Sequence, residues 1–165
     1  MPSTFINFMT PFVIIFSFPL LHFVTPQKIV TCFLKISMQE ELLLFKTFVI
    51  KQRQDRYINL IATDKGRKKL RSYIAHFEDI ESKYSTPLHS LKTNQGLVDL
   101  LKSEGAPPIC YIIAENSKYD MKSLPLTDAI TQLFNSGMAF FLSCIPGKLA
   151  YYEGENSSKR LLLKL

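Results

Sequence analysis

The sequence predicts an α+β fold, in which a helical N-terminal half packs on a small mixed sheet in the C-terminal half. Two observations support this prediction: helical spacing of apolar residues from 38 to 77, and successive strand, helix and hairpin signals from 109 to 153. The chain has 165 residues, of which 47% are hydrophobic and 21% charged, as is typical of a globular protein. This length suits one domain with its own core, which we place at residues 38–165.

The first 37 residues differ in composition from the rest of the chain. They contain no acidic residue, and residues 4–24 are uncharged, which is close to the roughly 20 apolar residues that a membrane-spanning helix needs. However, Pro11 and Pro19 lie inside this run, and an ordinary helix start follows at Met38. Two interpretations stay open: a membrane anchor with membrane contact through 4–24, or upstream sequence ahead of a native start at Met38. Both place the domain in the cytoplasm, the first because basic residues follow the apolar run.

The segment from 38 to 87 predicts helices followed by a loop. Three helical pieces are predicted, over Gln39–Gln52, Tyr57–Ile61 and Gly66–Phe77. Thr63 or Asp64 is placed to cap the third piece. Residues 78–87 break the helical spacing, so a loop is expected there.

Positive charge is concentrated in residues 46–71. This window has nine Lys and Arg residues and two acidic ones, a net charge of +7, whereas residues 72–165 carry a net charge of −1. Its densest run is GRKKLR, and the candidate binding residues are Lys65, Arg67, Lys68, Lys69 and Arg71. Such a surface binds nucleic-acid phosphates or an anionic membrane, although an ordinary solvated helix face has the same composition. No helix-turn-helix spacing, RNP-type aromatic motif or zinc finger favours the nucleic-acid interpretation.

The C-terminal half predicts a β-α-β unit followed by a hairpin. Helices are predicted from Thr93 or Asn94 to Gly105 and from Pro125 to Phe134, and strands over Ile109–Glu115, Met138–Ile145, Leu149–Glu153 and Arg160–Leu165. Pro146 and Gly147 predict a type II turn. Because strands joined by a helical crossover are normally parallel, we expect the first two strands to be parallel and the hairpin antiparallel.

Three residues are candidates for catalysis. Cys144 lies beside the predicted turn and is a nucleophile if a base approaches it, although free cysteines are more often buried. Glu115 and Asp120 follow the first strand, at the carboxyl end where α/β sheets bind ligands. The loop between them lacks the glycines of a phosphate-binding turn, which argues against a nucleotide. Cys32, Cys110 and Cys144 have neither disulfide-framework nor zinc spacing, and no metal or cofactor is predicted.

These observations predict a small cytoplasmic interaction or regulatory domain without catalytic activity, and they leave its partner open between a protein and nucleic acid. Nucleic-acid binding through the basic helical face 46–71 is the first alternative. An enzyme that uses Cys144 together with Glu115 or Asp120 is the second.

Overall fold

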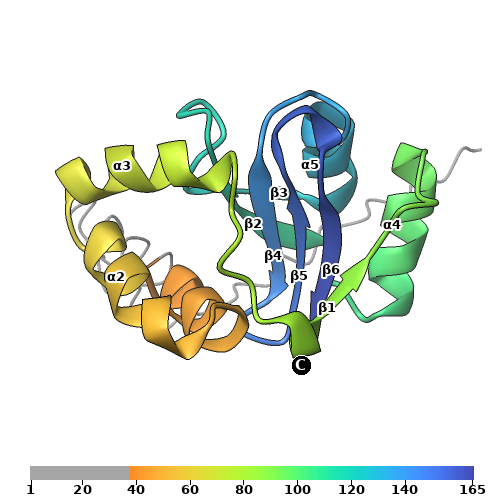
Figure 1. Cartoon of the computed structure of the whole chain (residues 1–165). Helices are drawn as coiled ribbons and strands as arrows, with labels where there is room; N and C mark the ends of the chain where they lie inside the picture. The colour runs from red at the N-terminus through yellow and green to blue at the C-terminus, as the bar shows by residue number, and fades with distance from the viewer. Residues whose placement is uncertain (1–37) are drawn as a thin grey trace, which may run out of the picture.

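A six-stranded antiparallel sheet forms the centre of the structure (Figure 1). The computed structural model describes residues 38–165. The strands are β1 (Ser85–Pro87), β2 (Ile109–Ala114), β3 (Lys122–Pro125), β4 (Phe140–Ile145), β5 (Leu149–Glu153) and β6 (Arg160–Lys164). Their order across the sheet is β1-β6-β5-β4-β2-β3, and every neighbouring pair is antiparallel. With its helices, this sheet confirms the predicted α+β class.

The helices lie in the segments that were predicted to be helical, although their bounds differ. Residues 38–48 form the first described helix, called helix 38–48 here. The others are α2 (Lys51–Ile61), α3 (Asp64–Ile74), α4 (Asn94–Ser103) and α5 (Leu126–Leu133), with two 3₁₀ turns at Ser82–Tyr84 and Glu155–Ser157. The Thr63 and Thr93 side chains accept hydrogen bonds from Gly66 N and Gly96 N, at 3.0 and 3.1 Å, and so cap α3 and α4.

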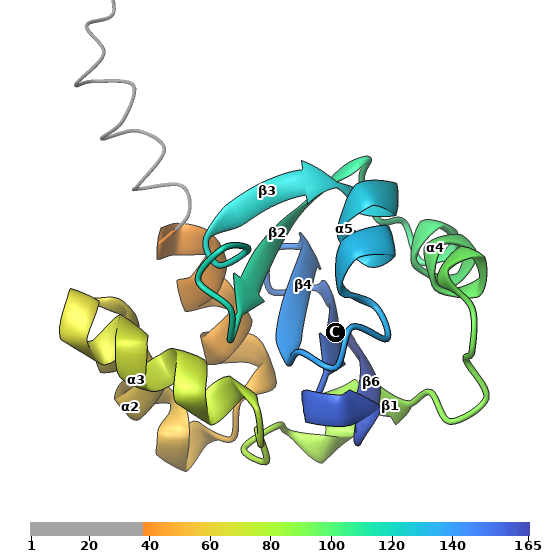
Figure 2. The ribbon, with the colours of Figure 1, turned by 90° about the horizontal axis from the view of Figure 1, so that it is seen from above.

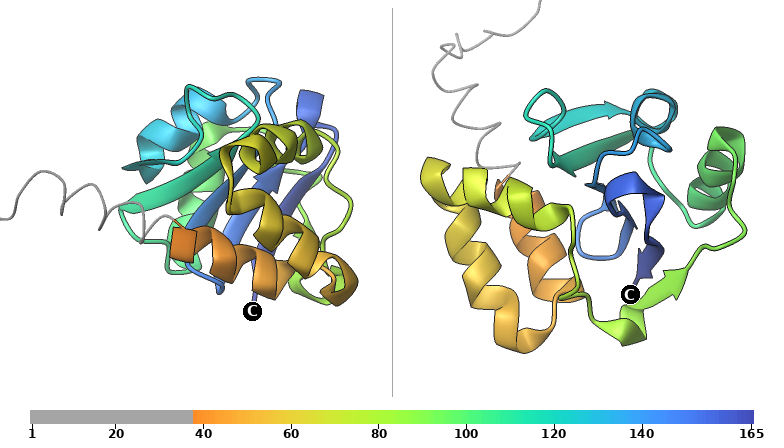
Figure 3. Two further views of the ribbon diagram at one scale, coloured as in Figure 1. Left: turned by 90° about the vertical axis from the view of Figure 1, so that its left-hand side faces the viewer. Right: turned by 45° about the horizontal axis from the view of Figure 1, so that its top comes forward.

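Two helical layers cover the two faces of the sheet (Figures 1 and 2). Helix 38–48, α2 and α3 pack on one face, and the left view of Figure 3 looks onto this layer. Helices α4 and α5 pack on the other face. Side chains of β2 alternate between the layers, with Tyr111 and Ile113 on the first side and Cys110 and Ile112 on the second.

Helix α3 is fastened to the sheet by apolar packing and by one tyrosine. Leu70 and Ile74 are fully buried in the first core. Beyond the helix, the Tyr152 hydroxyl on β5 donates to Ile74 O at 2.9 Å and accepts from Phe77 N at 3.1 Å. These contacts fix which face of α3 is turned to the interior.

The prediction of a parallel β-α-β unit in a mixed sheet is wrong. Strands β2 and β4 are antiparallel, with Tyr111 opposite Ser143. Between them lies β3, an unpredicted strand that pairs back on β2. Helix α5 therefore begins beside the start of β2, where Leu126 N donates to Pro108 O at 2.8 Å. The helix carries the chain to the opposite end of the sheet, so β4 begins beside the end of β2.

Three further local predictions are tested by the backbone. The Pro146 turn is confirmed, because Lys148 N donates to Ile145 O at 2.9 Å and Gly147 has a φ of 63°. The C-terminal strand is confirmed as β6, which pairs with both β5 and β1. The predicted loop 78–87 is wrong at its end, because it contains β1. The predicted continuous helix to Gln52 is also wrong, because Val49 forms a β-bridge with Ile80 that separates helix 38–48 from α2.

Within residues 38–165, no helix is both long and apolar enough to cross a membrane. The proposed anchor over 4–24 lies outside the described residues. The same holds for the other interpretation of the first 37 residues, as sequence upstream of Met38.

Candidate functional site

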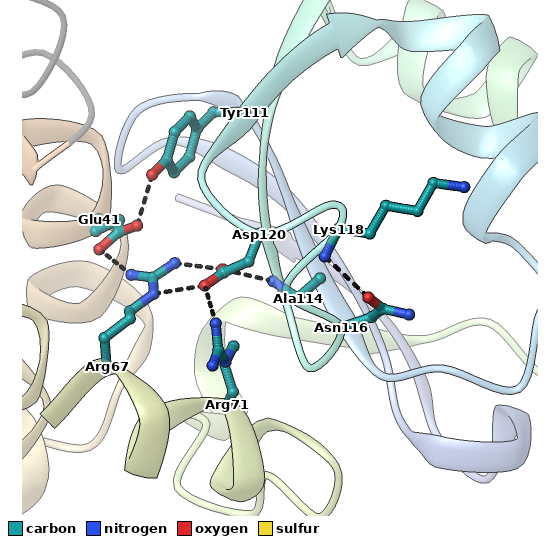
Figure 4. Close-up of polar contacts among 8 residues, drawn as sticks. All are labelled: Glu41, Arg67, Arg71, Tyr111, Ala114, Asn116, Lys118 and Asp120. Carbon is teal, nitrogen blue, oxygen red and sulfur yellow. Dashed lines mark hydrogen bonds and ion pairs between the residues drawn. The ribbon is translucent and has the colours of Figure 1, made fainter. Parts of the chain in front are cut away.

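Asp120, predicted as a site residue, lies between β2 and β3 and is buried, with 8% of the residue exposed. Its carboxylate accepts a hydrogen bond from Arg67 Nε at 2.7 Å and a second one from Arg67 Nη2 (Figure 4). Oδ1 also accepts from Ala114 N at 3.1 Å. Both carboxylate oxygens of Asp120 are therefore engaged inside the protein.

Arg67, predicted as a binding residue on the exposed basic face, is buried instead. It precedes Leu70 by three positions and Ile74 by seven, so it lies on the stripe of α3 that faces the core. Only 7% of the residue is exposed. Besides its two bonds to Asp120, Arg67 donates from Nη1 to Glu41 Oε2 at 2.5 Å. Its guanidinium group is not available to a phosphate at the surface.

Glu41 completes this group and was not predicted. It lies on helix 38–48 and is 2% exposed. The Tyr111 hydroxyl on β2 donates to Glu41 Oε1 at 2.6 Å. We call Glu41, Arg67, Tyr111 and Asp120 the Arg67 cluster (Figure 4).

The charges of the Arg67 cluster have opposing effects on its pKa values. Burial raises the pKa of Glu41 more than the charge and hydrogen bonds of Arg67 and the hydrogen bond of Tyr111 lower it. For Arg67, burial alone would lower the pKa, but the hydrogen bonds and charges of Asp120 and Glu41 outweigh it and raise the pKa. The cluster thus has a permanently charged guanidinium between two carboxylates. The four side chains of the cluster link helix 38–48, α3, β2 and the β2–β3 loop. This arrangement indicates a structural role.

Glu115, the second predicted acid, is half-buried at the end of β2 and contacts a different part of the chain. Its Oε2 accepts from Ala139 N at 3.4 Å, and its backbone N donates to Ala139 O at 3.0 Å. These bonds tie the end of β2 to the residue that precedes β4. Among the described residues no hydrogen bond joins Glu115 to Asp120, so the two predicted acids do not form a pair.

Cys144, the candidate nucleophile, lies in the second core on the α4–α5 side and is 4% exposed. Its hydrogen bond with Cys110 and its burial raise the pKa of its thiol. Its Sγ also lies 3.8 Å from Leu142 O. Asp120 contacts Arg67 of the opposite helical layer, so the predicted trio of Cys144, Glu115 and Asp120 does not converge. In the part of the chain that the structure describes, Cys144 has no base within hydrogen-bond distance.

The other predicted cations of α3 lie on its solvent side. Lys65, Lys68 and Lys69 are exposed. Arg56 of α2 approaches them from the neighbouring helix, with its Cζ 4.6 Å from the ring centre of Tyr73, and Lys69 Nζ lies 5.8 Å from the same ring. Hydrogen bonds from Arg56 and Lys69 lower the pKa of Tyr73. We call these five residues the α2–α3 surface.

Arg71 has an intermediate position between the α2–α3 surface and the Arg67 cluster. Its side chain is 26% exposed, and Nη1 lies 4.0 Å from Asp120 Oδ2. Of the five predicted binding residues, the three lysines are therefore exposed and Arg67 is buried. Arg71 is partly exposed and lies close to the buried carboxylate of Asp120.

Residues 38–165 contain no group of three or more His, Cys, Asp and Glu side chains arranged to hold a metal ion. The chain shows no significant match to a protein-family model, a curated protein or a solved structure.

Proposed function

We propose that this chain is a non-catalytic cytoplasmic domain that binds nucleic acid through the α2–α3 surface. One observation supports this above all others: Arg56, Lys65, Lys68 and Lys69 are exposed together, and none of them forms an ion pair within the described residues. Buried Arg67, on the same helix, has its charge offset by two carboxylates. The positive charge of the four exposed cations has no such offset.

The spacing of these cations suits a phosphate backbone. Lys65, Lys68 and Lys69 are related by three and four positions, so they lie on one side of α3. Arg56 and Tyr73 extend the same surface towards α2. Neutralising several phosphates releases condensed counterions, which is the main source of affinity for nucleic acid. The Tyr73 ring adds an aromatic group that contacts sugars or bases.

The composition of the surface favours nucleic acid over an acidic protein partner. Protein interfaces have apolar and aromatic centres and are depleted of lysine. None of the exposed large apolar side chains in the described part lies on α2 or α3; they are Met38, Leu43, Ile109, Met121 and Leu165. The enzyme alternative has less support, because the Cys144 thiol is buried and no base from residues 38–165 lies within hydrogen-bond distance of it.

The test is a salt series with a labelled DNA duplex of random sequence, measured by fluorescence anisotropy, with an RNA duplex of the same length in parallel. With four cations on phosphates, the logarithm of the affinity is expected to fall with the logarithm of salt concentration with a slope of about −3 to −4. A binding signal that does not depend on salt, or no binding to either duplex at low salt, contradicts the proposal.

Matched charge reversals locate the surface. The triple variant Lys65→Glu, Lys68→Glu and Lys69→Glu is expected to lose binding at every salt concentration. The control variant reverses three exposed lysines elsewhere on the protein and therefore has the same net charge as the triple variant. Its substitutions are Lys92→Glu, Lys102→Glu and Lys122→Glu. This control is expected to retain binding. Equal loss in both variants means that net charge alone is responsible and contradicts the assignment to α2–α3.

A further inference from the structure

A cavity of about 270 Å³ lies where β1 meets the β5–β6 connection. Residues 87–89 line one side of it and residues 157–161 the other. No residue of α2 or α3 lines it, so it is separate from the α2–α3 surface.

The lining of this cavity is basic. It includes His89, Lys159 and Arg160, two serines, and no acidic residue. The guanidinium group of Arg160 is already engaged within the fold, because Nη1 donates to Leu91 O at 2.9 Å and Nη2 lies 3.5 Å from Glu153 Oε1. His89 and Lys159 are exposed and make no side-chain hydrogen bond or ion pair with any described residue. They are free to bind a ligand.

The backbone conformation of the cavity wall formed by residues 157–159 is fixed by buried side chains beneath it. Asn156 and Ser157 have φ values of 53° and 55°, in the left-handed region that costs energy for residues other than glycine. The Ser157 hydroxyl donates to Glu153 Oε1 at 2.6 Å, and the Tyr151 hydroxyl donates to Glu153 Oε2 at 2.7 Å. Because Glu153 is 1% exposed, a buried carboxylate fixes the strained segment. Ser158 and Lys159 follow this segment directly, so their positions at the cavity are preorganised before a ligand binds.

We propose that this cavity binds a small phosphate monoester, with its phosphate group held by Lys159, His89 and the Ser158 hydroxyl. Charge-assisted hydrogen bonds from a lysine and a histidine are the strong kind that phosphate oxygens accept. The absence of a carboxylate from the lining removes the repulsion that excludes an anion. At about 270 Å³ the cavity falls just below the roughly 300–1,000 Å³ of sites for drug-sized molecules, so a small ester fits better than a nucleotide.

The test uses the full 165-residue chain, labelled with ¹⁵N and followed by NMR. Inorganic phosphate and glycerol phosphate are added separately, with the ionic strength held constant by sodium chloride. We expect saturable shifts at the amides of His89, Ser158 and Lys159, with tighter binding of glycerol phosphate. Shifts that stay linear with concentration, or that are confined to α2 and α3, overturn the site. Glycerol phosphate that binds no tighter than inorganic phosphate overturns the assignment to an ester.

Variants separate this site from general charge effects. Lys159→Gln and His89→Gln are each expected to weaken glycerol phosphate binding about tenfold, since each removes one charge-assisted hydrogen bond. Lys159→Arg keeps the charge and should retain most of the affinity. Lys68→Gln, on the α2–α3 surface, is expected to leave the affinity unchanged. Both substituted residues are exposed, so unchanged shifts in the sheet will show that the fold is intact. Unchanged affinity in the double variant that combines Lys159→Gln and His89→Gln overturns the proposal.

Discussion

Arg67 and Lys68 are neighbours in the same basic run, yet they lie in opposite environments. Arg67 is 7% exposed and is bonded to Glu41 and Asp120, whereas Lys68 is exposed to solvent. The difference comes from the period of the α-helix: Arg67 shares a stripe with Leu70, and Lys68 is turned about 100° away from it. Residues of one charged run in a sequence therefore do not all lie on the surface. One cation of α3 holds the fold together, and its neighbours are left for a ligand.

The comparison predicts that removing Arg67 is the most damaging single change on α3. Arg67→Ala leaves Glu41 and Asp120 buried without their cation, which is expected to lower the free energy of unfolding by about 3–5 kcal/mol. The measurement is urea denaturation of the variant and the parent protein.

Arg71 provides the matched control on the same helix. Its side chain is 26% exposed and approaches Asp120 only to 4.0 Å, so Arg71→Ala is expected to cost less than about 1 kcal/mol. The triple variant Arg67→Met, Glu41→Gln and Asp120→Asn removes all three charges and should recover much of the loss caused by Arg67→Ala. A cost for Arg67→Ala no larger than that for Arg71→Ala would contradict the structural role of the Arg67 cluster.

The second prediction concerns the pH dependence of the Arg67 cluster. Burial raises the pKa of Glu41 above its ordinary value of 4.5. The contribution of such a group to stability is complete below the ordinary pKa and is lost as pH rises through the raised pKa. Glu41→Gln cannot ionise, so its unfolding free energy relative to the parent protein is expected to increase as pH rises from the ordinary pKa of 4.5 through the raised pKa of Glu41, and to stay constant above it. Denaturation at several pH values measures this difference.

Tyr111→Phe tests how the pKa of Glu41 controls this pH dependence. The Tyr111 hydroxyl donates to Glu41 at 2.6 Å, and this bond lowers the pKa of Glu41. Its removal is expected to raise that pKa further, so that the total loss of stability with rising pH becomes larger and extends to higher pH. The double variant of Glu41→Gln and Tyr111→Phe should show neither effect. A stability difference between Glu41→Gln and the parent that falls with pH would mean that the Arg67 ion pair outweighs the burial of Glu41.

Local patterns predicted the interior of this fold better than its edges. Strands β2 and β4 were predicted because they are buried on both faces and so read as continuous apolar runs. Strands β1 and β3 are the two edges of the sheet, and their short sequences STP and KSLP carry proline and polar residues. Such residues are typical of edge strands and look like loops in a sequence. Missing β3 also caused the parallel β-α-β prediction, because the direction of β4 depends on it.

The same limit applies to the candidate site. The inward position of Arg67 follows from its spacing to Leu70 and Ile74, so this signal was present in the sequence. Its partners were not predictable in the same way, because Glu41 and Asp120 lie 26 and 53 positions from it. Helical spacing shows which side chains face the core. Only the arrangement of helix 38–48, α3 and the β2–β3 loop shows what they meet there.

Of the substitutions on α3, Lys68→Ala is expected to have the smallest effect on stability. Lys68→Ala removes an exposed side chain without an ion pair in residues 38–165, so the free energy of unfolding is expected to change by no more than about 0.5 kcal/mol. If the α2–α3 surface binds phosphates, the same variant should reduce the steepness of the salt dependence for duplex DNA by about 1. Urea denaturation and the anisotropy salt series measure the two quantities. A large loss of stability in Lys68→Ala, with unchanged DNA binding, would contradict the division of roles along α3, because Lys68 would then act as Arg67 does.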